Sequence, residues 1–407
     1  MSNIMFFCIP AHGHTNPTIK VVEELVKRGH RVRYFSFEEF REKIEQTGTE
    51  YVACDSFLPP TPQDLDAKVG KDFASLIEMV ADTTVNMDET VKRHMEEFKP
   101  NVVVSDSVCF WGKLFAWKYG VPFVCSTTTF AFNKYTARLM KQGLGEVVRM
   151  ITGMPRINAK IEMLKAHGYA VKDFVSIIQN DNDTNTIVYT SKMFQPMAET
   201  FSDKYVFVGP SVKEVAMKEA EPIEAGQGRA GEVKKRPLIY ISLGTVLNNN
   251  VKFYQRCIEA LSDMDCEVII SAGKKTDISK LKNVKENMQI FPYVDQMEVL
   301  AGTDVFLTHC GMNSVNESLY MGVPMVLFPQ HSEEYAVAHR TAELGAGLLI
   351  KRGSAPEIRK AISTVLTQNH YRKNAEKIGR NFRKCKGAGK AAEFIEKVAK
   401  LANATIG

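Results

Sequence analysis

Residues 305–317 read Val-Phe-Leu-Thr-His-Cys-Gly-Met-Asn-Ser-Val-Asn-Glu. The run from Val305 to Thr308 is typical of a parallel strand that is buried on both faces. A glycine turn follows it, and the polar residues after the turn begin a helix. Free backbone N–H groups and the positive end of a helix dipole attract anions at such a turn. The stretch therefore predicts an α/β fold with an anion site at a strand end.

Apolar runs alternate with helical patterns along the whole chain, which is typical of doubly wound α/β sheets. Strands are expected at residues 4–9, 32–35, 102–105, 123–126, 187–190 and 205–208, and then at 238–243, 268–271, 305–308 and 325–328. We expect the first helix to be capped by Asn16, with Pro17 at its first position.

The chain has 407 residues, which is too long for one hydrophobic core. Residues 213–236 are rich in Glu, Gly, Ala and Lys and lack apolar periodicity, so we expect an interdomain linker there. The predicted domains are residues 1–212 and 237–385. Residues 386–407 are expected to form a final helix that packs back on the first domain. A membrane-surface role for the basic C-terminal segment, residues 371–401, is the alternative.

Composition excludes several classes of protein. The hydrophobic content of 44% and the charged content of 24% are those of a globular protein, and a net charge of +5 without a basic stripe argues against nucleic-acid binding. The eight cysteines form no CxxC pair, and we interpret them as reduced core residues. With no leader or membrane span apparent, we expect a cytoplasmic monomer or homodimer without integral membrane contact.

Three motif-like signals are rejected. The glycines at 226, 228 and 231 match a dinucleotide fingerprint, but they lie in the expected linker rather than between a strand and a helix. Asp-x-Asp pairs, such as Asp64 with Asp66, are explained by turn chemistry. His12 and His14 have no carboxylate or thiol ligand near them in sequence. We therefore predict no metal and no other cofactor.

Two polar residues end neighbouring strands of the first half. His14 follows the first strand, and Asp106 follows the strand at residues 102–105, so both lie where open parallel sheets bind ligands. A carboxylate on one imidazole nitrogen sets the tautomer and leaves the other nitrogen able to take a proton. This pattern predicts a dyad that deprotonates an alcohol. The alternatives are a packing histidine in a turn and an aspartate that caps the helix near Val108.

In the second half, Asn313 and Ser314 can add hydrogen bonds to the anion site, and His309 lies beside them. Glu317 is placed one turn further, where it can accept from the two hydroxyls of a ribose. A capped helix without a ligand is the alternative.

Here the sequence resembles the UDP-glycosyltransferases, a family that includes bacterial macrolide and plant secondary-metabolite enzymes. The likeness covers nearly the whole chain and is strongest at residues 291–340. The motifs that carry it are Tyr293-Val-Asp-Gln296, His309-Cys-Gly-Met-Asn-Ser-x-x-Glu317, Gly322-Val-Pro324 and Pro329-Gln-x-x-Glu-Glu334. The resemblance implies a GT-B fold, in which two Rossmann-like doubly wound domains face a central cleft.

The resemblance also implies roles for individual residues. The donor nucleotide site comprises Gly244, Thr245, Tyr293, Val294, Gln296, His309, Gly311, Asn313, Ser314 and Glu317. Within it, Tyr293 stacks on uracil, Glu317 holds the ribose and the turn from His309 binds the diphosphate. The donor sugar contacts Thr128, Glu333 and Glu334. The catalytic base falls on His14, and its partner carboxylate on Asp106.

Two positions depart from the family pattern. Asp295 replaces a proline, and Glu334 replaces a glutamine, which removes two hydrogen-bond donors and adds a charge near the donor sugar.

The expected function is therefore inverting, metal-independent transfer of a hexose from a UDP-sugar to a hydroxyl of a small hydrophobic acceptor. UDP-glucose is the expected donor, and a macrolide, flavonoid or other polycyclic natural product the expected acceptor. Methionines of the first half, such as Met87, Met154 and Met163, suit a permissive pocket or form helix core. The alternatives are a nucleotide-sugar-binding subunit without catalysis and a nucleotide-sugar epimerase.

Overall fold

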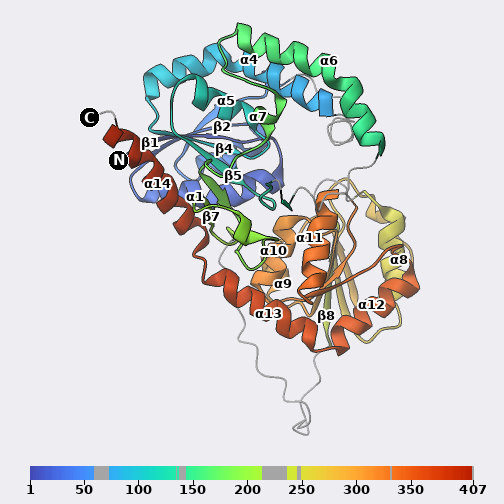
Figure 1. Cartoon of the computed structure of the whole chain (residues 1–407). Helices are drawn as coiled ribbons and strands as arrows, with labels where there is room; N and C mark the ends of the chain where they lie inside the picture. The colour runs from blue at the N-terminus through green and yellow to red at the C-terminus, as the bar shows by residue number, and fades with distance from the viewer. Residues whose placement is uncertain are drawn as a thin grey trace. The chain divides into compact units, whose positions relative to one another are not determined.

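The chain folds into two compact units. The structure is a computed structural model that describes residues 1–58, 73–133, 135–136, 144–212, 236–244, 249–330 and 332–405. One unit comprises Met1–Ser211 together with Cys385–Gly407, and the other comprises Val212–Lys384 (Figure 1). Of the predicted linker, residues 213–235 lie outside the described residues.

A parallel sheet forms the centre of the first unit, with strand order β3-β2-β1-β4-β5-β6-β7. Its strands are β1 Asn3–Phe7, β2 Arg31–Ser36, β3 Glu50–Ala53, β4 Val102–Asp106, β5 Phe123–Thr127, β6 Thr186–Val188 and β7 Tyr205–Phe207. The strand order reverses between β1 and β4. The helices that follow these two strands therefore lie on opposite faces of the sheet. The carboxyl ends of β1 and β4 form the edge at which a doubly wound sheet binds ligands.

Helices cover this sheet, and α4 and α6 run side by side (Figure 1). The helices of the first unit are α1 His12–Lys27, α2 Arg41–Glu45, α4 Phe73–Phe98, α5 Phe110–Lys118, α6 Leu144–Ala166, α7 Phe174–Ile178 and α14 Gly387–Thr405, with 3₁₀ turns η1 Glu38–Phe40 and η3 Ala198–Thr200. The strands β1 and β4 are almost wholly buried in the core between the helices.

The second unit repeats the same strand order around its own switch point, as β10-β9-β8-β11-β12-β13. Its strands are β8 Leu238–Ser242, β9 Glu267–Ser271, β10 Met288–Phe291, β11 Val305–Thr308, β12 Met325–Leu327 and β13 Gly347–Leu349. Its helices are α8 Val251–Leu261, α9 Gln296–Leu300, α10 Met312–Tyr320, α11 Ser332–Glu343, α12 Ala355–Thr367 and α13 His370–Arg383, with the 3₁₀ turn η4 Ile278–Lys280. The prediction of two Rossmann-like units is confirmed.

Three strands were not expected from the sequence: β3, β10 and β13. Each lies at an edge of its sheet. Both β3 and β10 contain exposed residues, so neither has the continuous apolar run that marks a central parallel strand. A pattern based on burial on both faces therefore recovers the sheet interior and misses these three edge strands, although the edge strand β7 was predicted.

The prediction for the start of the first helix is wrong. Helix α1 begins at His12, its N-cap is Ala11, and Pro17 lies inside it. Asn16 does not cap the helix, and its side chain accepts a hydrogen bond of 2.7 Å from Lys43 Nζ instead. The proline removes one backbone donor, but the turn before it is already formed by bonds from His14 and Thr15 N–H to the carbonyl of Ala11. The consequence is that His14 stands in the first helical turn.

The basic C-terminal segment, residues 371–401, forms two helices, α13 and α14, and α14 lies within the final helix predicted at residues 386–407. Lys386 and Gly387 both have positive φ, of 63° and 46°, which ends one helix and redirects the chain. Ile395 and Val398 of α14 are buried in the core of the first unit, and Glu396 pairs with His30 Nε2 at 3.0 Å. The apolar face of α14 is therefore covered by its own unit.

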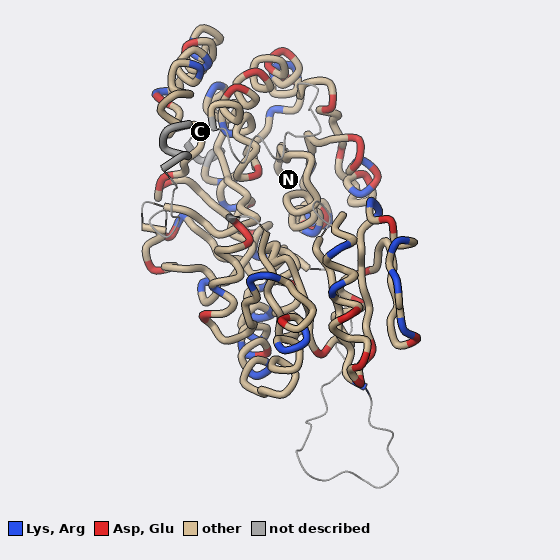
Figure 2. Tube along the Cα trace, turned by 90° about the vertical axis from the view of Figure 1, so that its right-hand side faces the viewer, with Lys and Arg blue, Asp and Glu red and all other residues tan. Residues whose placement is uncertain are grey.

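Charged residues of both signs are interspersed along the described chain (Figure 2). None of the helices in the described ranges is both long and apolar enough to span a bilayer.

One close contact joins α5 to the carboxyl end of β4. A Cβ added to Gly112 would lie 2.3 Å from Ser105 Oγ on β4. We predict that Gly112→Ala lowers the free energy of unfolding by about 1–3 kcal/mol, because overpacking outweighs the better helix propensity of alanine. Gly389→Ala in α14 is the control, since the nearest atom there is 3.8 Å away. Denaturant unfolding that gives both variants equal stability would contradict this prediction.

Candidate active site

His14 and Asp106 meet at the switch point of the first sheet. The Nδ1 atom of His14 lies 2.8 Å from Asp106 Oδ2. The Asp106 side chain is fully buried, whereas that of His14 is 19% exposed. The carboxylate can only accept, so Nδ1 carries the hydrogen, and in the neutral ring Nε2 is then the nitrogen that accepts a proton. The structure thus brings the predicted pair together in the geometry of a base and its orienting carboxylate.

His12, two residues away, is placed differently. Its Nε2 atom pairs with Glu39 at 2.9 Å, and its side chain is 42% exposed. Its ring also packs edge-on against Phe40. The two histidines stand two positions apart in the first turn of α1 and so point to different sides of the helix, and of the two only His14 faces Asp106.

Asp106 is held at both of its oxygens. Its Oδ1 accepts from Val108 N–H at 3.0 Å, while Oδ2 faces His14. Helix α5 begins at Phe110 with Cys109 as its N-cap, so the alternative in which Asp106 caps this helix is wrong. Burial raises the pKa of the nearby Cys8 thiol, and the charge of Asp106 raises it further. The second carboxylate bond sets its orientation toward the histidine.

Thr128 lies against the same nitrogen, with its Oγ1 3.1 Å from His14 Nδ1. Its side chain is buried at the end of β5. Sequence reasoning did not foresee this contact with the histidine. The contact of Thr128 with a donor sugar stays a prediction.

In the second unit, the turn after β11 is unusually tight. Cys310 has a φ of 73°, and Gly311 is the N-cap of α10 with no side-chain capping bond. A Cβ on Gly244 would lie 2.5 Å from His309 Cε1, and one on Gly311 would lie 2.5 Å from His309 Nε2. A side chain at either position would therefore displace the His309 ring, which packs between two backbone turns. Thr245 lies outside the described residues.

The first turns of α10 carry the remaining predicted donor residues, and Asn313 and Ser314 are half-buried there. The Nε2 atom of Gln296 donates to Glu317 Oε2 at 2.6 Å and to Ser314 Oγ at 3.2 Å. The amide thus connects α9 to α10 beside the tight turn.

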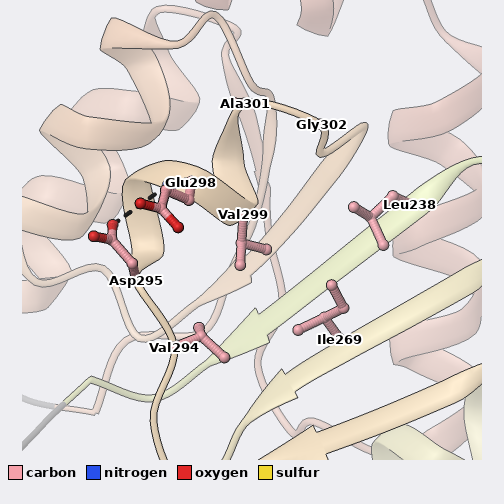
Figure 3. Close-up of a pocket in the computed structure, with 8 residues that line it drawn as sticks. All are labelled: Leu238, Ile269, Val294, Asp295, Glu298, Val299, Ala301 and Gly302. Carbon is pink, nitrogen blue, oxygen red and sulfur yellow. Dashed lines mark hydrogen bonds between the residues drawn. The ribbon is translucent and has the colours of Figure 1, made fainter. Parts of the chain in front are cut away.

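Asp295 is the N-cap of α9, and its side chain accepts from Met297 N–H at 3.1 Å. The aspartate at the usual proline position therefore starts the helix that carries Gln296. Val294 lines a pocket of about 440 Å³ under α9, where its side chain faces Leu238 and Ile269 (Figure 3). Tyr293, which precedes it, is 67% exposed, so its ring is accessible for stacking.

Glu333 and Glu334 lie in the first turn of α11. Glu333 is exposed, whereas Glu334 Oε2 accepts from the Gln330 N–H at 2.7 Å. Burial and then the charge of Glu334 raise the pKa of the Cys310 thiol, so this carboxylate lies near the tight turn. Glu334 thus acts as an acceptor at a helix start, a role that a glutamine oxygen also fills.

Tyr240 is a residue that the sequence analysis missed. It lies in β8, and its hydroxyl donates to Gln296 Oε1 at 3.3 Å. The sequence feature that could have identified it is a tyrosine hydroxyl within an otherwise apolar strand.

No group of three or more His, Cys, Asp or Glu side chains within the described ranges is arranged to hold a metal ion. Met87 is fully buried in the core of the first unit, and Met154 and Met163 pack against that core. These methionines contribute to the helix core rather than to an open surface.

Comparisons with known proteins agree with this arrangement. The family model described as erythromycin biosynthesis protein CIII-like, C-terminal domain, matches residues 255–397. The chain is 34% identical to the NDP-glycosyltransferase YjiC of Bacillus licheniformis, with 97% of each chain covered. It is 31% identical to the uncharacterized UDP-glucosyltransferase YdhE of Bacillus subtilis, over 99% of this chain and all of that protein.

Among solved structures, the calicheamicin glycosyltransferase CalG4 matches with a TM-score of 0.78 and 25% identity, over 98% of each chain. The GT-B fold class predicted from the sequence is confirmed by this likeness together with the two parallel sheets. Full-length identity above 30% to glycosyltransferases shows the family as well as the fold. The chain belongs to the UDP-glycosyltransferase family and is a glycosyltransferase enzyme.

Proposed function

We propose that the enzyme transfers a hexose from a UDP-sugar, preferably UDP-glucose, to a hydroxyl of a small hydrophobic natural product with inversion at the anomeric carbon. The observation that carries the proposal is the contact of 2.8 Å between His14 and a fully buried Asp106 at the switch point of the first sheet. A partly exposed imidazole oriented by a buried carboxylate suits removal of a proton from an alcohol.

In this mechanism the acceptor hydroxyl gives its proton to His14 Nε2 while its oxygen forms a bond to the anomeric carbon. The bond from that carbon to the diphosphate oxygen breaks at the same time, and UDP leaves with the electron pair. The imidazolium that forms is stabilised by Asp106, which offsets the unfavourable positive end of α1, because His14 lies in its first turn. One displacement from the face opposite UDP gives inversion.

The leaving diphosphate is assigned to the N-terminus of α10. The N-cap residue Gly311 has no side chain to occupy this helix start, and His309 is packed against the same turn. Donors and a helix dipole aimed at the developing charge supply the stabilisation that a metal supplies in other enzymes. Metal independence is part of the proposal for this reason.

A hydrophobic natural product is proposed as the acceptor because of the relatives' names. The matching family model concerns erythromycin biosynthesis, and a similar structure is a calicheamicin glycosyltransferase. Polycyclic alcohols such as macrolides and flavonoids are the class to test first.

Two alternatives are separated by the same assay. An epimerase needs acid and base groups at the sugar ring, and the candidates are Glu333 and Glu334, of which Glu334 is engaged with the Gln330 N–H. A binding subunit without catalysis leaves the oriented His14–Asp106 pair unexplained. Neither is favoured by the geometry described above.

We expect UDP release from UDP-glucose to require a hydrophobic alcohol and to continue in the presence of EDTA, because no step uses a metal. Coupled detection of UDP, with a panel of UDP- and TDP-sugars, measures this. Epimer formation without acceptor would support the epimerase, and tight binding without turnover would support the subunit. Activity lost on chelation and restored by a divalent cation would exclude the metal-independent mechanism.

We predict that His14→Ala lowers kcat by about 10²–10⁴-fold, since it removes the general base, while UDP still binds. His12→Ala is the matched control from the same helical turn, and its kcat is expected to change little. Steady-state kinetics with UDP binding by calorimetry distinguishes the two effects. A fully active His14→Ala variant would disprove the base assignment.

We predict that Glu317→Gln raises KM for the UDP-sugar about tenfold or more, because a hydrogen bond between a carboxylate and a ribose hydroxyl is charge-assisted. The KM for the acceptor should stay unchanged. Glu259→Gln on α8 serves as the control, since it also removes one carboxylate charge from this unit without touching the predicted donor residues. Equal donor KM values in both variants would contradict the role of Glu317.

A further inference from the structure

Tyr240 lies in β8, an interior strand of the second sheet, and contacts Gln296 of the predicted donor nucleotide site. It is 1% exposed, and its ring stacks on Phe306 of the neighbouring strand β11, with centroids 4.7 Å apart. The two residues are direct partners in the parallel register. The ring is therefore fixed by packing on a central strand, and its hydroxyl is presented to Gln296 from a rigid position.

The hydrogen bonds around Gln296 can run in one direction only. Glu317 is a carboxylate that accepts, so the Gln296 amide must turn its NH2 group toward it. The amide oxygen then faces Tyr240, whose hydroxyl must donate. Burial raises the pKa of the Tyr240 phenol, so the hydroxyl keeps its proton throughout the neutral range. The chain of bonds runs from Tyr240 through Gln296 to Glu317.

This chain orients one carboxylate. Gln296 Nε2 uses its two hydrogens on Glu317 and Ser314, residues that lie on one face of α10. Without the bond from Tyr240, the amide oxygen loses this partner, so the amide plane can tilt about its last torsion while its NH2 group still faces Glu317. Tyr240 therefore acts on Glu317 through Gln296 and has no need to touch the nucleotide.

We propose that Tyr240 is a positioning residue that, through Gln296, orients Glu317 for the ribose diol and so makes the enzyme discriminate ribonucleotide from 2′-deoxyribonucleotide donors. This inference rests on the proposed UDP-sugar site. A carboxylate that is correctly aimed binds two neighbouring hydroxyls, and it loses one of these bonds when the 2′-hydroxyl is absent.

The test compares the binding of UDP and 2′-deoxy-UDP by calorimetry. For Tyr240→Phe we expect UDP to bind about three- to tenfold more weakly, because one neutral hydrogen bond is lost, and 2′-deoxy-UDP to bind nearly as before. The preference for UDP should fall by the same factor. Tyr371→Phe removes the hydroxyl of another buried tyrosine in the same unit and should leave the preference unchanged.

A double-mutant cycle separates positioning from packing. In a Glu317→Gln background, Tyr240→Phe is expected to have no further effect on the preference, since the carboxylate that it orients is gone. An equal loss in both backgrounds, or an unchanged preference in Tyr240→Phe, would overturn the inference alone. Failure of the unmodified enzyme to bind UDP would overturn the proposed function together with it.

Discussion

The reversal of strand order beside the first strand of each sheet is the constraint on which the site depends. In the first unit β1 pairs with β4, and in the second β8 pairs with β11, always in parallel. Helices after the paired strands leave toward opposite faces, and the carboxyl ends of these strands are where open α/β sheets bind ligands. Under the proposed function, the first unit supplies a proton acceptor at this position, and the second unit supplies an anion-binding turn.

Close packing and hydrogen bonds fix the positions of the side chains at these strand ends. Gly244 and Gly311 leave room for the His309 ring, and the left-handed Cys310 turns the chain between β11 and α10. In the first unit Asp106 is held by the Val108 N–H, so it meets His14 in a single orientation. Buried polar groups of this kind are costly unless every bond is made, which ties the geometry of the site to the stability of the fold.

Much of this arrangement was predictable from the amino-acid sequence. The central strands are continuous apolar runs, because both of their faces are buried, and their ends carry His14, Asp106 and the turn from His309. Edge strands such as β3 escaped prediction because they are partly exposed. The start of α1 was misplaced because the capping preference of Asn16 and Pro17 is weaker than the backbone bonds that already form the turn at Ala11.

By itself, the sequence determined the number of units, their α/β class and the residue types available for proton removal and diphosphate binding, since these follow from local periodicity and short motifs. Only the tertiary structure decided that His12 pairs with Glu39, that Thr128 contacts His14, and that a tyrosine in β8 supports Gln296. The physical reason is that these contacts join residues far apart in the chain, and side-chain packing across neighbouring strands sets their distances.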